Sequence, residues 1–118
     1  MAEFLRQAPS SPAFKQRGLS GCQFPLQLSE LEIYDVDVEY GHDDFITSPT
    51  ITHIYYVTHG RGTFVINEEH MPVTMGDLIE IPPGNTFAFS GRMKLLLIMS
   101  PPFLQNAIRS VGANPDVP

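Results

Sequence analysis

Hydrophobic residues alternate with polar ones along most of this chain, in short runs that end at glycine or proline. Within residues 27–40 the apolar positions are Leu28, Leu31, Ile33, Val36, Val38 and Tyr40. Successive side chains of a strand point to opposite faces, so this period of two predicts a half-buried β-strand. Leu31 and Ile33 are odd-numbered but the last three positions are even-numbered. We therefore expect a bulge near Tyr34 and Asp35 that keeps one apolar face inward.

The rest of the chain predicts further strands separated by turns. The runs rich in β-branched and aromatic residues are 50–58, 63–66, 73–75, 78–81, 86–89 and 93–99. We expect turns at residues 59–62 and 67–70, a bend at Gly76 and Asp77, and a rigid loop at residues 82–84. About nine or ten short strands without a crossover helix predict an all-β sandwich or barrel.

The two ends of the chain differ from its middle. Residues 1–23 lack a clean period, and Pro9 and Pro12 break any helix there, so we expect an N-terminal arm or an edge strand. Residues 24–100 are expected to form the barrel. Residues 101–118 are expected to form a short C-terminal helix, in the segment FLQNAIRSV, or a tail.

Composition and charge restrict the partners and the compartment. The chain has 118 residues, which fits one domain, and its net charge of −6 with scattered lysines and arginines argues against a nucleic-acid partner. A lone cysteine, Cys22, cannot form an internal disulfide, and no apolar run suggests a signal peptide or a membrane span. We expect a cytoplasmic protein without a membrane partner, with a weak organelle address in the N-terminal residues as the alternative.

Two glycine-framed segments resemble the two sequence motifs of the cupin family. The first motif consists of a glycine, two histidines, a glutamate and a second glycine at fixed spacing, and Gly41, Thr47, Pro49, His53 and Gly60 stand at those positions here. The resemblance implies a double-stranded β-helix, the jelly-roll barrel of a small RmlC-like cupin.

The second motif has the same spacing as its family counterpart but a different residue at its histidine position. A glycine, a Pro-x-Gly turn, a histidine and an asparagine define this motif, and Gly76, Pro82, Gly84, Phe87 and Gly91 stand at those positions. Metal-dependent cupins bind their ion with the histidines and the glutamate of the two motifs, a donor set that suits divalent transition metals.

The four positions of this chain that match the family's metal ligands hold Thr47, Pro49, His53 and Phe87. Only His53 is a strong ligand, and one strong ligand does not make a tight metal site. We therefore expect no family-type metal and no cofactor.

The resemblance also places His53 on an inward strand face, and alternation extends that face. Tyr55 and Val57 would share it, with Phe87 and Phe89 across the barrel. The expected ligand-binding residues are Thr47, His53, Tyr55, Val57, Phe87 and Phe89. Such a lining suits a small organic ligand with a flat or apolar part and one polar group. His53 and Tyr55 are the expected catalytic residues, and core packing is the alternative for each.

A loop with three polar residues follows Gly41. His42, Asp43 and Asp44 suggest an imidazole and carboxylate cluster at one end of the barrel. Adjacent residues of an exposed loop usually face water, and we expect that here.

Three functions fit these observations. The first is a metal-independent cupin that binds a small molecule or acts as an isomerase or epimerase using His53, because the cupin family includes sugar-nucleotide epimerases and ketoisomerases that work without metal. The second is a metal-dependent oxygenase, isomerase or lyase with non-standard ligands, such as His53 with His42. The third is a non-catalytic structural or regulatory dimer. We expect a homodimer, since small cupins commonly pair and the N-terminal arm has no evident role within one barrel.

Overall fold

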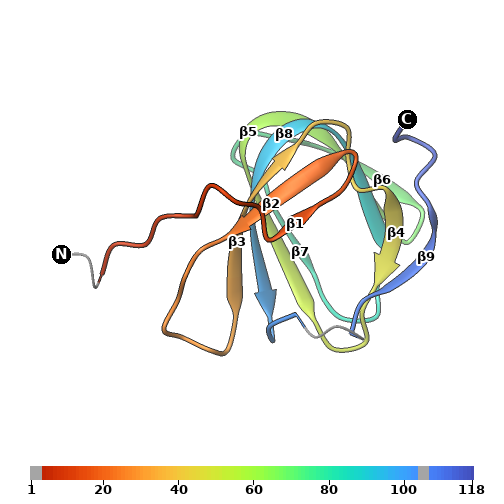
Figure 1. The fold of residues 1–118 in the computed structure, drawn as a ribbon. Coiled ribbons are helices and arrows are strands. Elements are labelled where there is room, and N and C mark those ends of the chain that lie inside the picture. Colours follow the sequence, from red (N-terminus) through yellow and green to blue (C-terminus); the bar gives the residue numbers. More distant parts are fainter. Residues whose placement is uncertain (1–3, 104–106) are drawn as a thin grey trace.

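Two long strands, β5 (Thr52–Ile66) and β8 (Phe87–Ser100), pair antiparallel along most of their lengths and curve together through the molecule (Figure 1). The computed structural model describes residues 4–103 and 107–118, and within them it contains strands and no helix. The remaining strands are β1 (Phe14–Lys15), β2 (Leu19–Gln23), β3 (Glu32–Val38), β4 (Asp44–Thr47), β6 (Glu69–Thr74), β7 (Leu78–Ile81) and β9 (Arg109–Ala113). The all-β prediction is confirmed.

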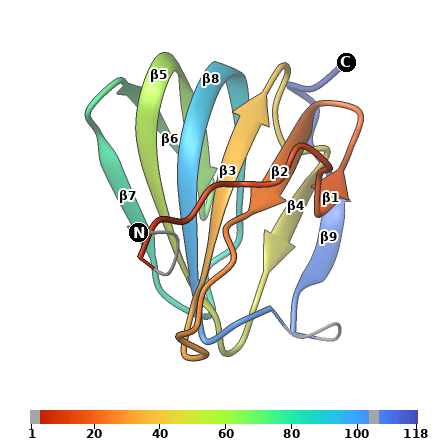
Figure 2. The same ribbon diagram turned by 60° about the vertical axis from the view of Figure 1, so that its left-hand side comes forward.

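Strands β5 and β8 belong to both halves of the barrel. The second half of β8 pairs with β3, which continues through β2 to β1, whereas the start of β8 pairs with β4, which continues to β9. On its other side β5 pairs first with β7 and then with β6. The sheet therefore curls until its two halves face each other across a common interior, which is the jelly-roll arrangement (Figure 2).

The bend in these two strands depends on glycine. The register shifts between Val57 and His59, and φ is +80° at Gly60 and +130° at Gly91. A Cβ at Gly60 would collide with the carbonyl oxygen of Arg92, and L side chains rarely adopt either φ value. The predicted turn at residues 59–62 is therefore wrong, because the chain bends there without leaving the strand.

Strand β3 runs without the predicted bulge. It pairs with β2 and with β8 in one continuous register. Tyr34, Val36 and Val38 are buried on its inner face, and Ile33 is half-buried on the outer face. The prediction failed because Tyr34 itself occupies the inward position, so the odd-numbered apolar residues belong to the outer surface.

The two ends of the chain extend the sheets. Residues 14–23 add β1 and β2 at one edge, and residues 4–10 project away from the body (Figure 1). The predicted C-terminal helix is wrong over residues 109–111, which belong to strand β9 beside β4. Its residues 104–106 lie outside the described residues. Within the described ranges no helix has the length and hydrophobicity needed to cross a membrane.

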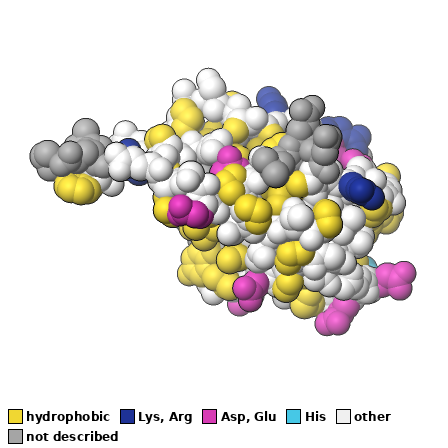
Figure 3. All heavy atoms as spheres, turned by 90° about the horizontal axis from the view of Figure 1, so that it is seen from below, with side chains coloured by type: hydrophobic (Ala, Val, Ile, Leu, Met, Phe, Trp, Pro, Cys, Tyr) yellow, Lys and Arg dark blue, Asp and Glu magenta, His cyan; other side chains and the backbone are white. Residues whose placement is uncertain are grey.

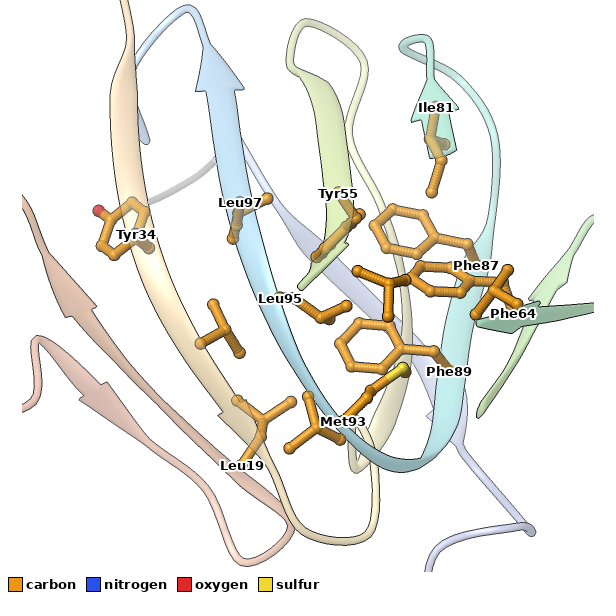
Figure 4. Packing of buried hydrophobic residues seen from close by; sticks show 14 of the residues in the cluster. Leu19, Tyr34, Tyr55, Phe64, Ile81, Phe87, Phe89, Met93, Leu95 and Leu97 are labelled. Atoms are coloured by element: carbon orange, nitrogen blue, oxygen red, sulfur yellow. The ribbon is translucent and has the colours of Figure 1, made fainter. Parts of the chain in front are cut away.

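The core between the sheets is densest around a group of aromatic side chains. Phe64, Phe87 and Phe89 are almost completely buried, and Tyr55 packs among them (Figure 4). The Phe64 and Phe89 ring centroids lie 4.9 Å apart, and the Tyr55 and Phe64 centroids 5.2 Å apart. These tilted ring pairs stabilise the fold beyond their hydrophobic burial, and they fill one side of the barrel interior.

Candidate ligand-binding site

A cavity of about 560 Å³ occupies the other side of the barrel interior. Its wall is mostly apolar, with contributions from Leu19, Val36, Phe89 and Leu97. The polar residues that line it are Gln16, Gln23, Glu32, Tyr34, His42, Asp44, His53, Tyr55 and Ser110. This volume and this mixture of surfaces are typical of sites for small organic molecules.

His42 has a hydrogen-bond partner at each of its two ring nitrogens. It follows β3 in the loop that leads to β4, and its Nδ1 lies 2.8 Å from the carbonyl oxygen of Asp44. Its Nε2 lies 3.3 Å from the side-chain nitrogen of Gln16, and its ring packs edge-on against Phe89 with centroids 5.8 Å apart. Two hydrogen-bond contacts and the Phe89 ring thus hold the imidazole in place.

The hydrogen bonds around Gln16 define the tautomer of His42. The backbone N–H of Asp43 donates to Oε1 of Gln16 over 3.2 Å, so the Gln16 amide presents its nitrogen to His42. Since that nitrogen can only donate, Nε2 of His42 accepts. The ring proton is then on Nδ1, because the carbonyl of Asp44 at 2.8 Å can only accept and outweighs the longer 3.3 Å approach of the Asp44 N–H to the same nitrogen. His42 therefore carries its lone pair on Nε2, the nitrogen beside Gln16.

Burial keeps His42 neutral. Removal from water lowers its pKa, and this outweighs the opposing effects of the Asp44 carbonyl and of the nearby Asp43 and Asp44 charges. A neutral imidazole with a fixed acceptor nitrogen has the properties of a general base.

A second layer of hydrogen bonds holds the His42 loop in place. The side-chain nitrogen of Asn114 donates to the carbonyl oxygens of His42 and Phe89 over 3.0 and 3.2 Å, and its backbone N–H donates to Asp43. The C-terminal segment thereby ties the loop to β8. Within the described residues Oδ1 of Asp43 is buried without a hydrogen-bond partner.

His53 has a different environment from His42. Its side chain is only 2% exposed, stacks with Tyr55 at 6.3 Å and meets Phe87 edge-on at 5.1 Å between centroids. Burial, with a smaller effect of His42, lowers the pKa of His53 to about 4. Neither ring nitrogen has a hydrogen-bond partner among the described residues, so nothing there fixes its tautomer.

Tyr55 presents a phenol to the same cavity. Its side chain is 3% exposed, and burial raises its pKa, so the hydroxyl keeps its proton at neutral pH. Among the residues that the structure describes, this hydroxyl has no hydrogen-bond partner. Tyr55 is therefore a candidate donor toward a bound molecule.

The far end of the cavity carries a separate polar cluster. Glu32 accepts hydrogen bonds from the Gln23 side chain at 3.0 Å, the Tyr34 hydroxyl at 3.2 Å and the backbone N–H of Phe103 at 2.8 Å. Burial and the Glu32 charge raise the pKa of Tyr34 to about 12, so its hydroxyl also remains a donor.

The expected ligand-binding residues divide into two groups. His53, Tyr55 and Phe89 line the cavity together, whereas Thr47, Val57 and Phe87 are not among its lining residues. Val57 and Phe87 are buried in the core, as the predicted inward face requires.

The expectation that His42 and its neighbours face water is wrong. His42 and Asp44 line the cavity, and Asp43 contacts Gln16. The nearest signal in the sequence was the motif glycine Gly41, whose backbone bridges to Ser90. Gln16, Gln23 and Glu32 had no motif that could have marked them.

The positions of the family's metal ligands do not fit a metal ion in this fold. His53 is the only strong ligand among them, and its neighbours on the inner face are aromatic. Within residues 4–103 and 107–118 no three His, Cys, Asp or Glu side chains come together in a way that could hold a metal.

Comparison with known proteins identifies the family. The model of the AraC-like ligand binding domain matches residues 41–115, more than half of the chain, and the chain belongs to this cupin-type family. Among curated protein sequences, none matches the chain significantly.

Solved structures similar to the chain are cupins. A tyrosine-to-phenylalanine variant of Pac13 from Streptomyces with uridine is 26% identical, covers 94% of this chain and 88% of its own, and has a TM-score of 0.81. A histidine-to-glutamine variant of Pac13 with uridine is 25% identical over 96% of this chain and 94% of its own, with a TM-score of 0.86. Pac13 is described as a nucleoside dehydratase.

Ectoine synthase from P. lautus is a more distant structural relative. It is 15% identical over 86% of this chain and 81% of its own, with a TM-score of 0.67. That similarity shows the fold alone. The predicted cupin jelly-roll barrel is confirmed.

Proposed function

We propose that this AraC-like ligand-binding domain holds a nucleoside-sized organic molecule in its cavity and acts on it as a metal-independent acid–base catalyst, with His42 as the base. One observation carries the proposal: the buried imidazole is held neutral, with its acceptor nitrogen fixed at the cavity wall by Asp44 and Gln16. His53, the histidine expected to be catalytic from the sequence, becomes part of the aromatic wall in this proposal.

Size, polarity and similarity support a nucleoside-like ligand. The cavity of about 560 Å³ has polar groups at both ends and apolar side chains between them. A nucleoside has the same distribution, since a flat ring joins a hydroxylated sugar. The 26% identity to Pac13, which binds uridine, favours the same ligand class here.

The proposed chemistry is proton abstraction from a carbon next to a carbonyl group. His42 Nε2 releases its long, 3.3 Å hydrogen bond from Gln16 and takes the C–H proton, and the electron pair forms a double bond as a β-hydroxyl group departs. The proton gained by His42 is the one that the departing hydroxide needs, so water and an unsaturated product form without another reactant. Return of that proton to a different position or face gives isomerisation or epimerisation instead. Tyr55 donates a hydrogen bond to the polarised carbonyl.

Hydrogen exchange tests the role of His42. We expect the protein to catalyse deuterium incorporation from D₂O into an aldehyde or keto derivative of a nucleoside or sugar, followed by NMR. His42→Gln should reduce the exchange rate by about 100-fold or more, because the base is lost. His59→Gln is the matched control, since His59 is exposed on β5, and should exchange at the original rate. Equal rates for His42→Gln and the unmodified protein would overturn the proposal.

Metal independence is tested separately by elemental analysis of protein purified without a metal-affinity tag. We expect well under one equivalent of iron, nickel, manganese or zinc, because His53 is the only strong ligand at the family positions. Stoichiometric metal that chelation removes together with activity would contradict the proposal.

We also propose a cytoplasmic homodimer in which the N-terminal arm contacts the partner. Residues 4–10 of this arm project from the body (Figure 3), with Phe4 79% exposed and Leu5 64% exposed. Light scattering should give twice the chain mass of 13.1 kDa at micromolar concentration, and a monomer mass would exclude the dimer.

A further inference from the structure

We infer that Gln23, held by Glu32, forms a second recognition subsite that reads the amide edge of a ring at the far end of the ligand from His42. The inference rests on the proposed function for where the ligand lies in the cavity. It does not depend on the reaction proposed for His42. It assigns a specificity role to a cluster that the proposed reaction does not use.

The orientation of the Gln23 amide is set by its partner. Its nitrogen donates to Oε2 of Glu32 over 3.0 Å, while Oε1 of Glu32 accepts from the Tyr34 hydroxyl and from the Phe103 N–H. Glu32 is thus held by three donors on three different segments. A carboxylate can only accept, so the amide nitrogen of Gln23 must face it.

This arrangement leaves Gln23 with unused hydrogen-bonding capacity. Within the described residues, one N–H and the carbonyl oxygen of its amide have no partner, and the side chain lines the cavity. Polar groups in a cavity wall are left without compensation unless water or a ligand pairs with them. A donor and an acceptor side by side are the complement of an amide or imide edge, in which N–H and C=O are also adjacent.

The distance between the two polar ends fits a molecule of nucleoside length. Gln16 lies between β1 and β2, where its backbone N–H donates to the carbonyl of Leu19, the first residue of β2, and its side chain bonds His42. Gln23 is the last residue of β2. Four residues of extended strand span about 13 Å. The Val36 and Leu97 side chains line the interval, and apolar side chains there suit the faces of a flat ring.

The ligand class is therefore a heterocycle with a ring N–H next to a carbonyl group, such as a pyrimidine dione, attached to a hydroxylated group that reaches His42. Uridine has this edge. Methylation of its ring N3 removes the donor and adds a group that blocks the edge, so 3-methyluridine is the matched probe.

Calorimetric titration with uridine and 3-methyluridine tests the inference. The unmodified protein should bind uridine about 10- to 100-fold more tightly, because methylation breaks both hydrogen bonds. Gln23→Leu should weaken uridine binding about tenfold and bring the two ligands to similar affinities. Tyr34→Phe should keep the preference, because Tyr34 donates to the other oxygen of Glu32. Gln27→Leu, at an exposed loop position, is the matched control.

The outcomes separate this inference from the proposed function. No uridine binding, equal binding of the two probes by the unmodified protein, or a preference that survives Gln23→Leu would overturn the subsite. If the preference depends on Gln23 but His42→Gln leaves hydrogen exchange unchanged, the subsite stands and the proposed base fails. If exchange depends on His42 while Gln23→Leu changes nothing, the base stands and the subsite fails.

Discussion

The two sides of the barrel interior use the same strands for opposite purposes. On one side Tyr55, Phe64, Phe87 and Phe89 fill the space with ring against ring. On the other side the same sheet leaves a cavity with an oriented histidine and a hydrogen-bonded polar cluster. A residue position can therefore keep its place in the fold even when its side chain no longer suits the role that the family gives it. His53 and Phe87, at metal-ligand positions of the family, pack together, and the candidate base lies in the loop after Gly41.

Truncation on the packed side should have the largest effect on stability. Phe87→Ala should lower the free energy of unfolding by about 3–5 kcal/mol, because Phe87 is 1% exposed and contacts His53 and Tyr55. Phe14→Ala, at the half-buried wall of the cavity, should cost clearly less. Urea unfolding of both variants measures the difference. Equal losses would contradict the division into a packed and a hollow side.

Acid should destabilise the protein through His53. Its pKa is about 4 in the folded state and 6.5 without perturbation, so the unfolded chain binds the proton first as the pH falls. The stability is complete above pH 6.5 and declines toward pH 4, by about 3 kcal/mol for this group. Denaturant unfolding at several pH values measures the slope. His53→Gln should reduce the slope and leave the part that His42 contributes through its own lowered pKa, and His59→Gln should leave the slope unchanged. An undiminished slope in His53→Gln would assign the effect to another group.

Removal of the Asn114 side chain should loosen the cavity side alone. Asn114→Ala should lower the free energy of unfolding by about 1–2 kcal/mol, because the part-buried carbonyl of His42 loses its side-chain donor and the carbonyl of Phe89 keeps, among the described residues, only the His42 N–H. The exchange of backbone amide hydrogens with solvent should accelerate more in residues 41–47 than in β5. Uniform exchange changes along the chain would contradict a local role.

The smallest expected effect concerns the pKa of His42. Gln16 donates to Nε2 only when that nitrogen is unprotonated, so Gln16→Leu should raise the pKa of His42 toward its ordinary value. NMR titration of the imidazole measures it, and Gln27→Leu is the control. An unchanged pKa in Gln16→Leu would mean that burial alone keeps His42 neutral.

The sequence predicted much of the fold but only part of the site. Alternation placed Tyr55, Phe87 and Phe89 inward, because strand geometry is local. It could not distinguish a turn from a bent strand at residues 59–62, since the same glycines permit both. It also could not bring Gln16, Gln23 and Glu32 into one cavity with His42, because these contacts join segments far apart in the chain.

The sequence by itself therefore determined the strand content, the glycine framework and the loss of the family's metal ligands. Each of these depends on residue identity and short-range spacing. The tertiary structure decided that hydrogen bonds orient His42 and that aromatic rings pack around His53. Gln16 and Asp44 are the hydrogen-bond partners of His42, and Phe89 packs against its ring. His53 packs against Phe87, and the curled sheet brings all of these residues together. The chemistry of a histidine depends on these neighbours, and alternation along a single strand does not reveal them.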